Sequence, residues 1–276
     1  MVELGKFNTL TVIKQVPFGM YLQGGHLGEV LLPSRYCPDD IEIGSEVEVF
    51  LYLDSDDLPI ATTEKPKATV GQCAYLKVVD INKAGAFLDW GLSKDLLVPY
   101  SEQHKPFELG RSYVVCIYLD AAQDRITASS KLSRHLQEFS QYFKAHQKVE
   151  LLICGKSELG CKAVINHTHL GLIYKDELFK PLNYGQRLDG FIKALRDDGK
   201  INLSIQPHAA KGRDELCERI LAHLREREGV SHLTDKSTPE DIHREFNVSK
   251  SNYKKALGRL YKDRLVELGT SEVKLI

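Results

Sequence analysis

The sequence contains no run of apolar residues that approaches the roughly 18 needed to cross a membrane. It has one tryptophan and two methionines, and its six cysteines form no Cys-x-x-Cys pair. Its 37 basic and 38 acidic side chains nearly cancel, so no overall charge attracts polyanions. The N-terminus lacks the charged-then-apolar layout of a signal peptide. These absences exclude a helical membrane protein, argue against a cysteine-based zinc site and predict a cytoplasmic location.

The near-neutral total hides a large difference between two parts of the chain. Residues 1–64 carry 3 basic and 11 acidic side chains, whereas residues 147–276 carry 23 basic and 19 acidic ones. The first segment therefore repels a phosphate chain and the second attracts it. The charge pattern predicts nucleic-acid binding in the C-terminal half and leaves the acidic first segment as a surface for a basic protein partner.

An internal repeat organises the first three quarters of the chain. Identical residues recur at a constant offset of 66 over more than forty positions, and a weaker third copy follows at an offset of 75. Members of the series include Gly19, Gly85 and Gly160, and also Leu31, Leu97 and Leu172. A fixed period over this length indicates repeated structural units.

Each repeat has the pattern of a small β-barrel. Residues 65–131 contain short β-rich runs separated by Gly, Pro and Asp, which is typical of strands joined by tight turns. Five strands in about 62 residues fit the OB-fold, a Greek-key barrel whose second and third strands commonly bind oligonucleotides. The nine extra residues before the third copy fall in 132–146, where Leu132, Leu136, Phe139 and Phe143 recur at helical spacing. This spacing predicts a short amphipathic helix as a linker.

The repeats resemble a known RNA-binding module. A glycine-started strand, Gly85-Ala86-Phe87-Leu88, and a Gly-Leu-Val-like strand, Gly171-Leu172-Ile173-Tyr174, are similar to the repeat of ribosomal protein S1. Three such repeats followed by a helical tail resemble the bacterial conserved virulence factor B family. The resemblance implies a cytoplasmic RNA-binding regulator rather than an enzyme.

The last segment, residues 211–276, changes to a mixed α/β pattern. A helix is predicted from Asp214 to Glu228, a second begins after the N-cap Thr238, and a third begins after Ser249. The final residues read as a β-hairpin. Helices followed by a hairpin are typical of a winged-helix domain.

The third of these helices has one apolar and one basic side. Projected at 100° per residue, Tyr253, Ala256, Leu257 and Leu260 share one arc. The other side is predicted to contact phosphates, either of RNA or of DNA, through Lys254, Lys255, Arg259 and Lys262.

In the barrels, the S1 resemblance implies that aromatic side chains on strands two and three stack on bases. The second barrel offers Phe87 and Trp90 for this role. The third offers Tyr174, with Lys162 at the position of the second aromatic. The remaining candidates of the third barrel are basic: Lys175, Arg187, Lys193 and Arg196.

Catalytic, metal and cofactor sites are not predicted. Cys116, Cys154 and Cys161 stand where the other repeats have Phe, Ile, Val, Met or Ala, so cysteines are expected to be reduced and to fill cores. The acidic run that includes Asp54, Asp56 and Asp57 falls between strands four and five of the first barrel, where Asp is typical of turns.

The sequence therefore predicts a mainly β protein with a C-terminal α/β module. It has OB-fold barrels over 1–64, 65–131 and 147–210, a helical linker over 132–146 and a winged helix over 211–276. The predicted function is binding of single-stranded RNA by the third barrel and the winged helix, in post-transcriptional regulation. The alternatives are a DNA-binding transcription regulator and a protein-interaction scaffold using the acidic first barrel.

Overall fold

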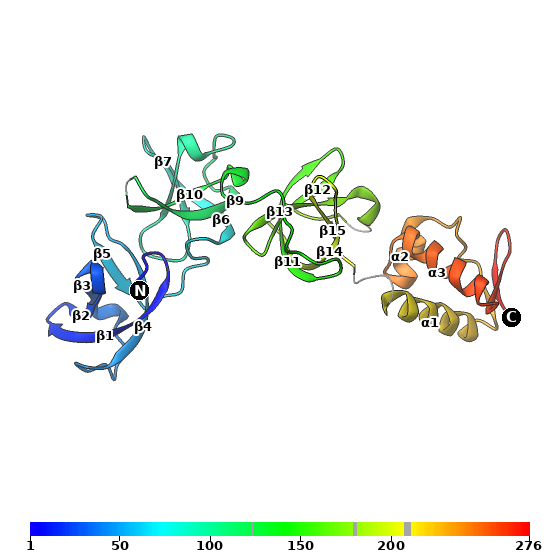
Figure 1. Ribbon diagram of the computed structural model, residues 1–276, viewed down its shortest axis with the longest axis horizontal. Helices are drawn as coiled ribbons and strands as arrows, with labels where there is room; N and C mark the ends of the chain where they lie inside the picture. Colours follow the sequence, from blue (N-terminus) through cyan, green and yellow to red (C-terminus); the bar gives the residue numbers. More distant parts are fainter. Residues whose placement is uncertain (123, 179–180, 207–210) are drawn as a thin grey trace. The chain divides into compact units, whose positions relative to one another are not determined.

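The chain divides into two compact units, Met1–Leu136 and Gln137–Ile276. The first unit contains two β-barrels, and the second contains a third barrel and a helical domain (Figure 1). The structure is a computed structural model, and it describes residues 1–122, 124–178, 181–206 and 211–276.

Barrel 1 is closed, with the strand order β1-β2-β3-β5-β4. Strand β1 bends at an irregularity between Val12 and Lys14 and so pairs with both β2 and β4. The parallel contact that closes the barrel joins Leu31 of β3 to Ile60 of β5. The strands are β1 (Phe7–Val16), β2 (Gly19–Gln23), β3 (Glu29–Pro33), β4 (Glu46–Leu53) and β5 (Pro59–Thr62).

Barrel 3 repeats this closed arrangement, with β13 and β15 forming the parallel contact. Barrel 2 has the same order of neighbours, but β8 and β10 are not hydrogen-bonded to each other, so its sheet stays open there. The strands of barrel 2 are β6 (Cys73–Ile81), β7 (Gly85–Asp89), β8 (Leu96–Pro99), β9 (Ser112–Asp120) and β10 (Arg125–Ser129). Those of barrel 3 are β11 (Lys148–Ser157), β12 (Gly160–Ile165), β13 (His169–Tyr174), β14 (Arg187–Leu195) and β15 (Ile201–Ser204).

A glycine begins the second strand of every barrel, and the repeat conserves it for a steric reason. Gly19, Gly85 and Gly160 have φ of 153–154°. A Cβ atom at any of them would lie within 2.3 Å of the carbonyl oxygen of Leu32, Val98 or Ile173, respectively, on the third strand. Only glycine permits this close approach of two strands.

The predicted linker helix over 132–146 is wrong. The segment contains only a 3₁₀ turn at Leu132–Arg134 among the described elements, and then forms isolated β-bridges to barrel 3 at Gln137 and Phe139. The backbone of Gln137 bonds to the carbonyl of Thr168 (3.0 Å) and to the amide of Leu170 (2.8 Å). These sheet-like bonds replace the bonds that a helix would make, and tertiary pairing thus outweighs the helical spacing of the apolar residues.

The expectation that all cysteines are reduced is wrong for one pair. Cys73 of β6 and Cys116 of β9 oppose each other in the strand register and are joined by a disulfide. Cys161 is buried in the core of barrel 3, as its repeat position predicts.

The C-terminal domain is the predicted winged helix, with an additional short strand. Thr238 accepts a hydrogen bond from the Asp241 amide, and Ser249 accepts one from the Asn252 amide, so both predicted N-caps are confirmed. The sheet order is β16-β18-β17. The elements are α1 (Lys211–Glu226), β16 (Val230–Ser231), α2 (Pro239–Phe246), α3 (Lys250–Lys262), β17 (Val266–Leu268) and β18 (Val273–Leu275). Among the described helices, none is both long and apolar enough to cross a membrane.

Two glycine substitutions are expected to change stability in opposite directions. Gly160→Ala forces a Cβ against the Ile173 carbonyl and is expected to destabilise barrel 3 by about 1–3 kcal/mol. Gly258→Ala, inside α3 with open space around the new Cβ, is expected to stabilise the winged helix by about 0.5–1 kcal/mol. Calorimetric unfolding measures both, and an unchanged transition for Gly160→Ala would contradict the steric argument.

Candidate nucleic-acid interface

Barrel 3 has a pocket on the face formed by its second, third and fifth strands, which we call the strand 2–3–5 face. Strand β13 supplies Tyr174 at its end, and β12 supplies Lys162, whose register partner is Leu172. The residues that line the pocket include Leu159, Lys162, Leu172, Tyr174, Arg196 and Lys200. Three of the predicted site residues, Lys162, Tyr174 and Arg196, therefore come together here.

The ring of Tyr174 is half-buried and held by a neighbouring cation. Arg196 Nη1 donates a hydrogen bond to the Tyr174 hydroxyl at 3.3 Å, while Arg196 Nη2 lies 3.1 Å from an Asp198 carboxylate oxygen. Lys162 and Lys200 line the same pocket, and both are exposed to solvent. An aromatic ring beside exposed cations can stack on a base while the cations contact the adjoining phosphates.

Sequence reasoning missed several residues of this pocket, among them Leu159, Lys200 and Asn202. Lys200 lies just before β15, and Leu159 is 59% exposed in the turn before β12. The repeat itself contained a signal for Lys200, because the offset of 75 aligns it with Arg125, another cation.

Three other predicted residues of barrel 3 do not line the pocket. Lys175 follows Tyr174 in a short 3₁₀ turn and is exposed. Arg187 forms an ion pair with Glu150, and Lys193 Nζ lies 2.7 Å from a Glu177 carboxylate oxygen. Arg187 and Lys193 are thus partly neutralised by acids of their own barrel.

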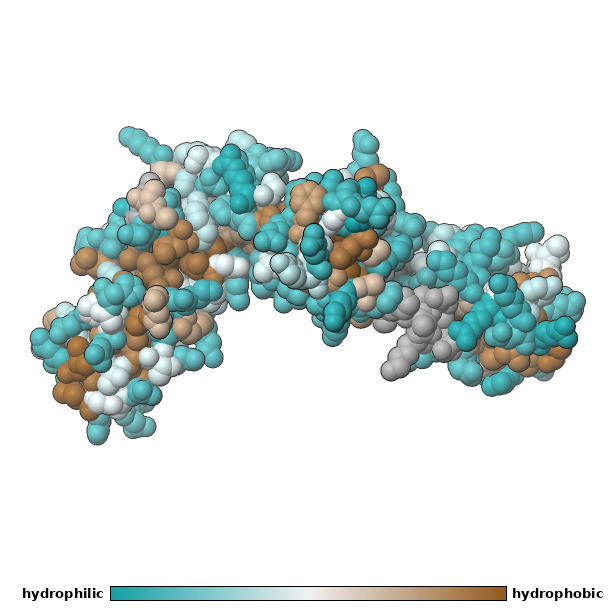
Figure 2. Space-filling model, in the orientation of Figure 1, coloured by the Kyte–Doolittle hydropathy of each residue, from teal (hydrophilic) through white to brown (hydrophobic). Residues whose placement is uncertain are grey.

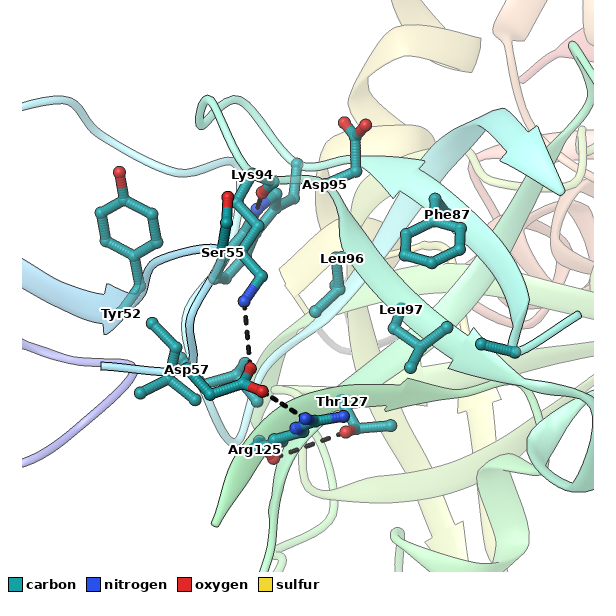
Figure 3. A pocket seen from close by; sticks show the side chains of 14 residues that line it. Tyr52, Ser55, Asp57, Phe87, Lys94, Asp95, Leu96, Leu97, Arg125 and Thr127 are labelled. Carbon is teal, nitrogen blue, oxygen red and sulfur yellow. Dashed lines mark hydrogen bonds and ion pairs between the residues drawn. The ribbon is translucent and has the colours of Figure 1, made fainter. Parts of the chain in front are cut away.

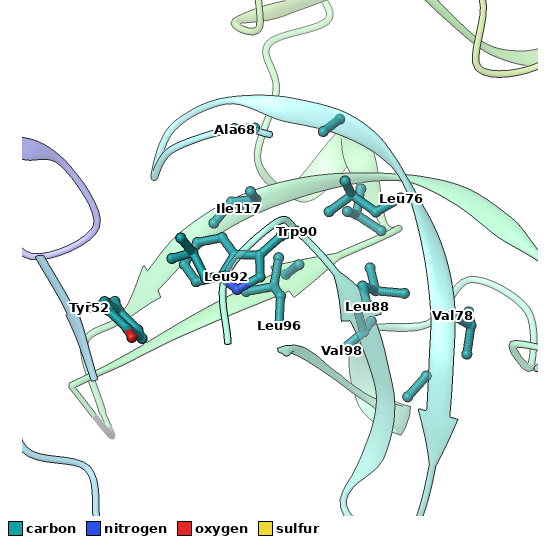
Figure 4. Packing of buried hydrophobic residues seen from close by; sticks show 14 of the residues in the cluster. Tyr52, Ala68, Leu76, Val78, Leu88, Trp90, Leu92, Leu96, Val98 and Ile117 are labelled. Atoms are coloured by element: carbon teal, nitrogen blue, oxygen red, sulfur yellow. The ribbon is translucent and has the colours of Figure 1, made fainter. Parts of the chain in front are cut away.

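In barrel 2 the structure separates the two predicted stacking residues. Phe87 lines a pocket on the strand 2–3–5 face. Trp90, however, is only 3% exposed and packs in the core with Leu96 and Ile117 (Figure 4). Its indole nitrogen donates to the Lys94 carbonyl at 2.6 Å. The prediction that Trp90 stacks on a base is therefore wrong, because its ring is part of the core of barrel 2.

Barrel 1 also presents aromatics on this face, in acidic surroundings. Phe18 is 56% exposed, and the Lys14 ammonium lies 5.6 Å from the centre of the Tyr21 ring. Lys14 is one of only three basic residues in residues 1–64, and it is already engaged in this cation–π contact.

The predicted basic side of α3 is exposed. Tyr253, Ala256, Leu257 and Leu260 are buried against the rest of the winged helix, as the projection predicts. Lys254 pairs with Asp235 and Arg259 with Asp263, each at 3.6 Å. The winged-helix face in Figure 2 is mostly hydrophilic, with a smaller apolar area. The exposed cations are Lys254, Lys255, Arg259 and Lys262.

The thiol of Cys154, which is near enough to Lys162 to be affected by its charge, is not set up as a nucleophile. Burial raises the pKa of Cys154 to about 12, although the nearby charge of Lys162 opposes the shift. The thiol is therefore protonated at neutral pH, and the thiolate is the reactive form. Among the side chains that the structure describes, no group of three or more His, Cys, Asp or Glu is placed to hold a metal ion.

Comparisons with known proteins agree with this architecture. An S1 domain model matches residues 4–64 and 70–131, and a CvfB-like winged helix domain model matches residues 218–275. Both are types of nucleic-acid-binding domain and not types of catalytic domain.

Several relatives span most of the chain. The uncharacterized protein YitL of Bacillus subtilis is 30% identical, covering 94% of this chain and 89% of its own. Conserved virulence factor B of Staphylococcus epidermidis and of Staphylococcus aureus are each 25% identical over 86% of this chain and 82% and 81% of theirs.

A solved structure from Streptococcus pneumoniae, described as a multidomain protein with nucleic acid binding domains, is 24% identical. It covers 99% of this chain and 98% of its own, with a TM-score of 0.42. Both family models match this chain, and the relatives cover most of its length. The chain therefore belongs to the conserved virulence factor B family, in which S1 domains are followed by a CvfB-like winged helix.

Proposed function

We propose that this protein binds single-stranded RNA with little sequence preference, through the strand 2–3–5 face of barrel 3 and the basic side of α3, and regulates gene expression after transcription in the cytoplasm. The observation that carries the proposal is the half-buried Tyr174 ring with Lys162, Arg196 and Lys200 beside it. A flat ring accepts any base, and cations accept any phosphate.

A single strand fits this pocket better than a duplex. Stacking on Tyr174 requires an unpaired base, which single-stranded RNA offers in loops and ends. The pocket also contains Asn202, whose amide can donate to or accept from a base edge or a 2′-hydroxyl.

A DNA-binding regulator is the second candidate, because α2 and α3 form a helix-turn-helix with an exposed basic side. In such motifs the second helix enters the major groove of a duplex. The two candidates differ in the nucleic acid that they prefer.

The deciding experiment compares single-stranded RNA, single-stranded DNA and duplex DNA of equal length at two salt concentrations. The proposal expects the single strands to bind more tightly than the duplex, with RNA first, and affinity to fall as salt rises. A preference for duplex DNA would favour the transcription regulator, and binding of none of them would contradict both.

Removing the Tyr174 ring is expected to weaken RNA binding. Base stacking contributes about 1–3 kcal/mol, so Tyr174→Ala should reduce affinity by roughly fivefold to over a hundredfold, whereas Tyr174→Phe should retain most of it. Tyr142→Ala removes a tyrosine that is 88% exposed in the same unit and serves as the control. Equal losses for Tyr174→Ala and Tyr142→Ala, in folded proteins, would refute the stacking role.

Reversing charges on α3 is expected to weaken binding to all sequences alike. Lys255→Glu combined with Arg259→Glu should lower the slope of log affinity against log salt by about one per lost phosphate contact. Arg225→Glu, on the exposed side of α1, is the control for a charge reversal elsewhere in the domain. An unchanged salt slope in the folded double variant would show that α3 does not contact the nucleic acid.

A further inference from the structure

Barrel 2 has a pocket on its strand 2–3–5 face that shares several positions with the pocket of barrel 3. The offset of 75 places Phe87 at the position of Lys162, Arg125 at that of Lys200 and Thr127 at that of Asn202. All three residues of barrel 2 line its pocket, and all three counterparts line the pocket of barrel 3. The two pockets are therefore the same site on two copies of the fold.

In barrel 2 this site is partly occupied by barrel 1. The pocket wall includes Tyr52 and Leu53 from the end of β4, and Ser55 and Asp57 from the turn between β4 and β5 (Figure 3). We call this turn, residues 54–58, the acidic turn. It meets barrel 2 at the open side, where the pocket is lined by both β8 and β10.

The Asp57 carboxylate lies between the two cations of the site. Its Oδ1 is 3.3 Å from Lys94 Nζ, and its Oδ2 accepts a hydrogen bond from Arg125 Nη2. Lys94 also donates to the backbone carbonyl of Asp54. Burial alone would raise the pKa of Asp57, but Lys94 and Arg125 outweigh it and hold the pKa below its usual value. The carboxylate is therefore an anion at neutral pH.

The acidic turn is built to present this anion. Asp54 Oδ1 accepts hydrogen bonds from the amides of Asp56 and Leu58, each at 2.9 Å. Asp57 adopts φ of 60°, a left-handed conformation that Asp and Asn tolerate better than most residues. The Asp57 oxygens thus stand where a phosphate must lie to reach Arg125 and Lys94.

We propose that barrel 2 is a second binding site for single-stranded nucleic acid, which the acidic turn keeps closed because Asp57 takes the place of a backbone phosphate. The proposal takes its ligand class from the function proposed above, but its mechanism concerns barrels 1 and 2 alone. A strand that binds this site displaces the Asp57 carboxylate, stacks a base on Phe87 and pairs its phosphates with Arg125 and Lys94.

The contact can open without separating the barrels. Phe50 and Tyr52 are 0% and 3% exposed and belong to one core with Trp90, whose ring centre is 5.7 Å from that of Phe50. This apolar contact anchors barrel 1. In contrast, the side chains of Asp57 and Arg125 are 36% and 46% exposed, and exposed ion pairs contribute little and are screened by salt.

The chain contains its own reporter for this site. Trp90 is its single tryptophan, it lines the pocket of barrel 2, and its indole nitrogen donates to the backbone carbonyl of Lys94. Displacement of Asp57 from Lys94 is expected to change the emission of Trp90, whereas binding at barrel 3 is expected to leave it unchanged. Fluorescence titration of the full chain therefore separates the two sites.

The test uses Asp57→Asn, which removes the charge and keeps a residue that tolerates the left-handed conformation. Asp57→Gly is the second variant, and Asp56→Asn is the matched control, since Asp56 is an exposed acid of the same turn. Each is placed in the full chain with Tyr174→Ala and Lys200→Glu, which disable the barrel 3 site. The probe is single-stranded RNA of about eight nucleotides, the length of a typical OB-fold site.

The proposal expects Asp57→Asn and Asp57→Gly to bind the RNA on the order of fivefold more tightly than the background, as judged by Trp90 emission. The salt slope should steepen by about one for each cation released. Asp56→Asn should change neither, and adding Phe87→Ala should abolish the gain.

The proposal is overturned if folded Asp57→Asn and Asp57→Gly bind no better than Asp56→Asn, or if the gain survives Phe87→Ala. A failure of the function proposed for barrel 3 is seen separately, as an unchanged affinity when Tyr174→Ala and Lys200→Glu are introduced into the wild-type chain. Each result can therefore occur without the other.

Discussion

Each barrel of this protein depends on a backbone approach that only glycine permits, at the first residue of its second strand. Gly19, Gly85 and Gly160 let the second strand lie against a carbonyl of the third, and the two strands have the same register in all three barrels. The register in turn decides which side chains point to the strand 2–3–5 face. Because all three barrels share it, the three faces can be compared residue by residue.

The three faces share a frame and differ in chemistry. The equivalent position carries Tyr21 in barrel 1, Phe87 in barrel 2 and Lys162 in barrel 3. Barrel 3 has no aromatic residue at this position, but it has Tyr174 at the end of β13. Arg196 donates a hydrogen bond to the hydroxyl of Tyr174. Residues 1–64 carry 11 acidic side chains, and one of them, Asp57, contacts Lys94 and Arg125 of barrel 2. One fold thus yields three surfaces with different side chains at equivalent positions, which accords with the general separation of fold and function.

The sequence predicted what local rules and the repeat determine. The constant offset located the barrels, and Thr238 and Ser249 marked helix starts because capping is a local interaction. It could not predict features set by distant contacts. The backbone of Gln137 pairs with barrel 3 instead of entering a helix, and Trp90 packs in the core of barrel 2 with Phe50 of barrel 1. Lys200 was missed although the repeat aligns it with Arg125, because neither charge nor alignment reveals which side chains share a pocket.

The pairing of the linker with barrel 3 affects how this barrel meets other molecules. Strand β15 pairs with β13 only from Gly171 onward, which would leave the start of β13 with unpaired amides and carbonyls. The backbone of Gln137 bonds to that stretch, and the Ser140 amide bonds to the Gly199 carbonyl just before β15. An open strand edge invites pairing with a second chain. The residues inserted between the second and third repeats thus protect barrel 3 against edge-to-edge association. Deleting them would expose backbone amides and carbonyls that can pair with a strand of another chain.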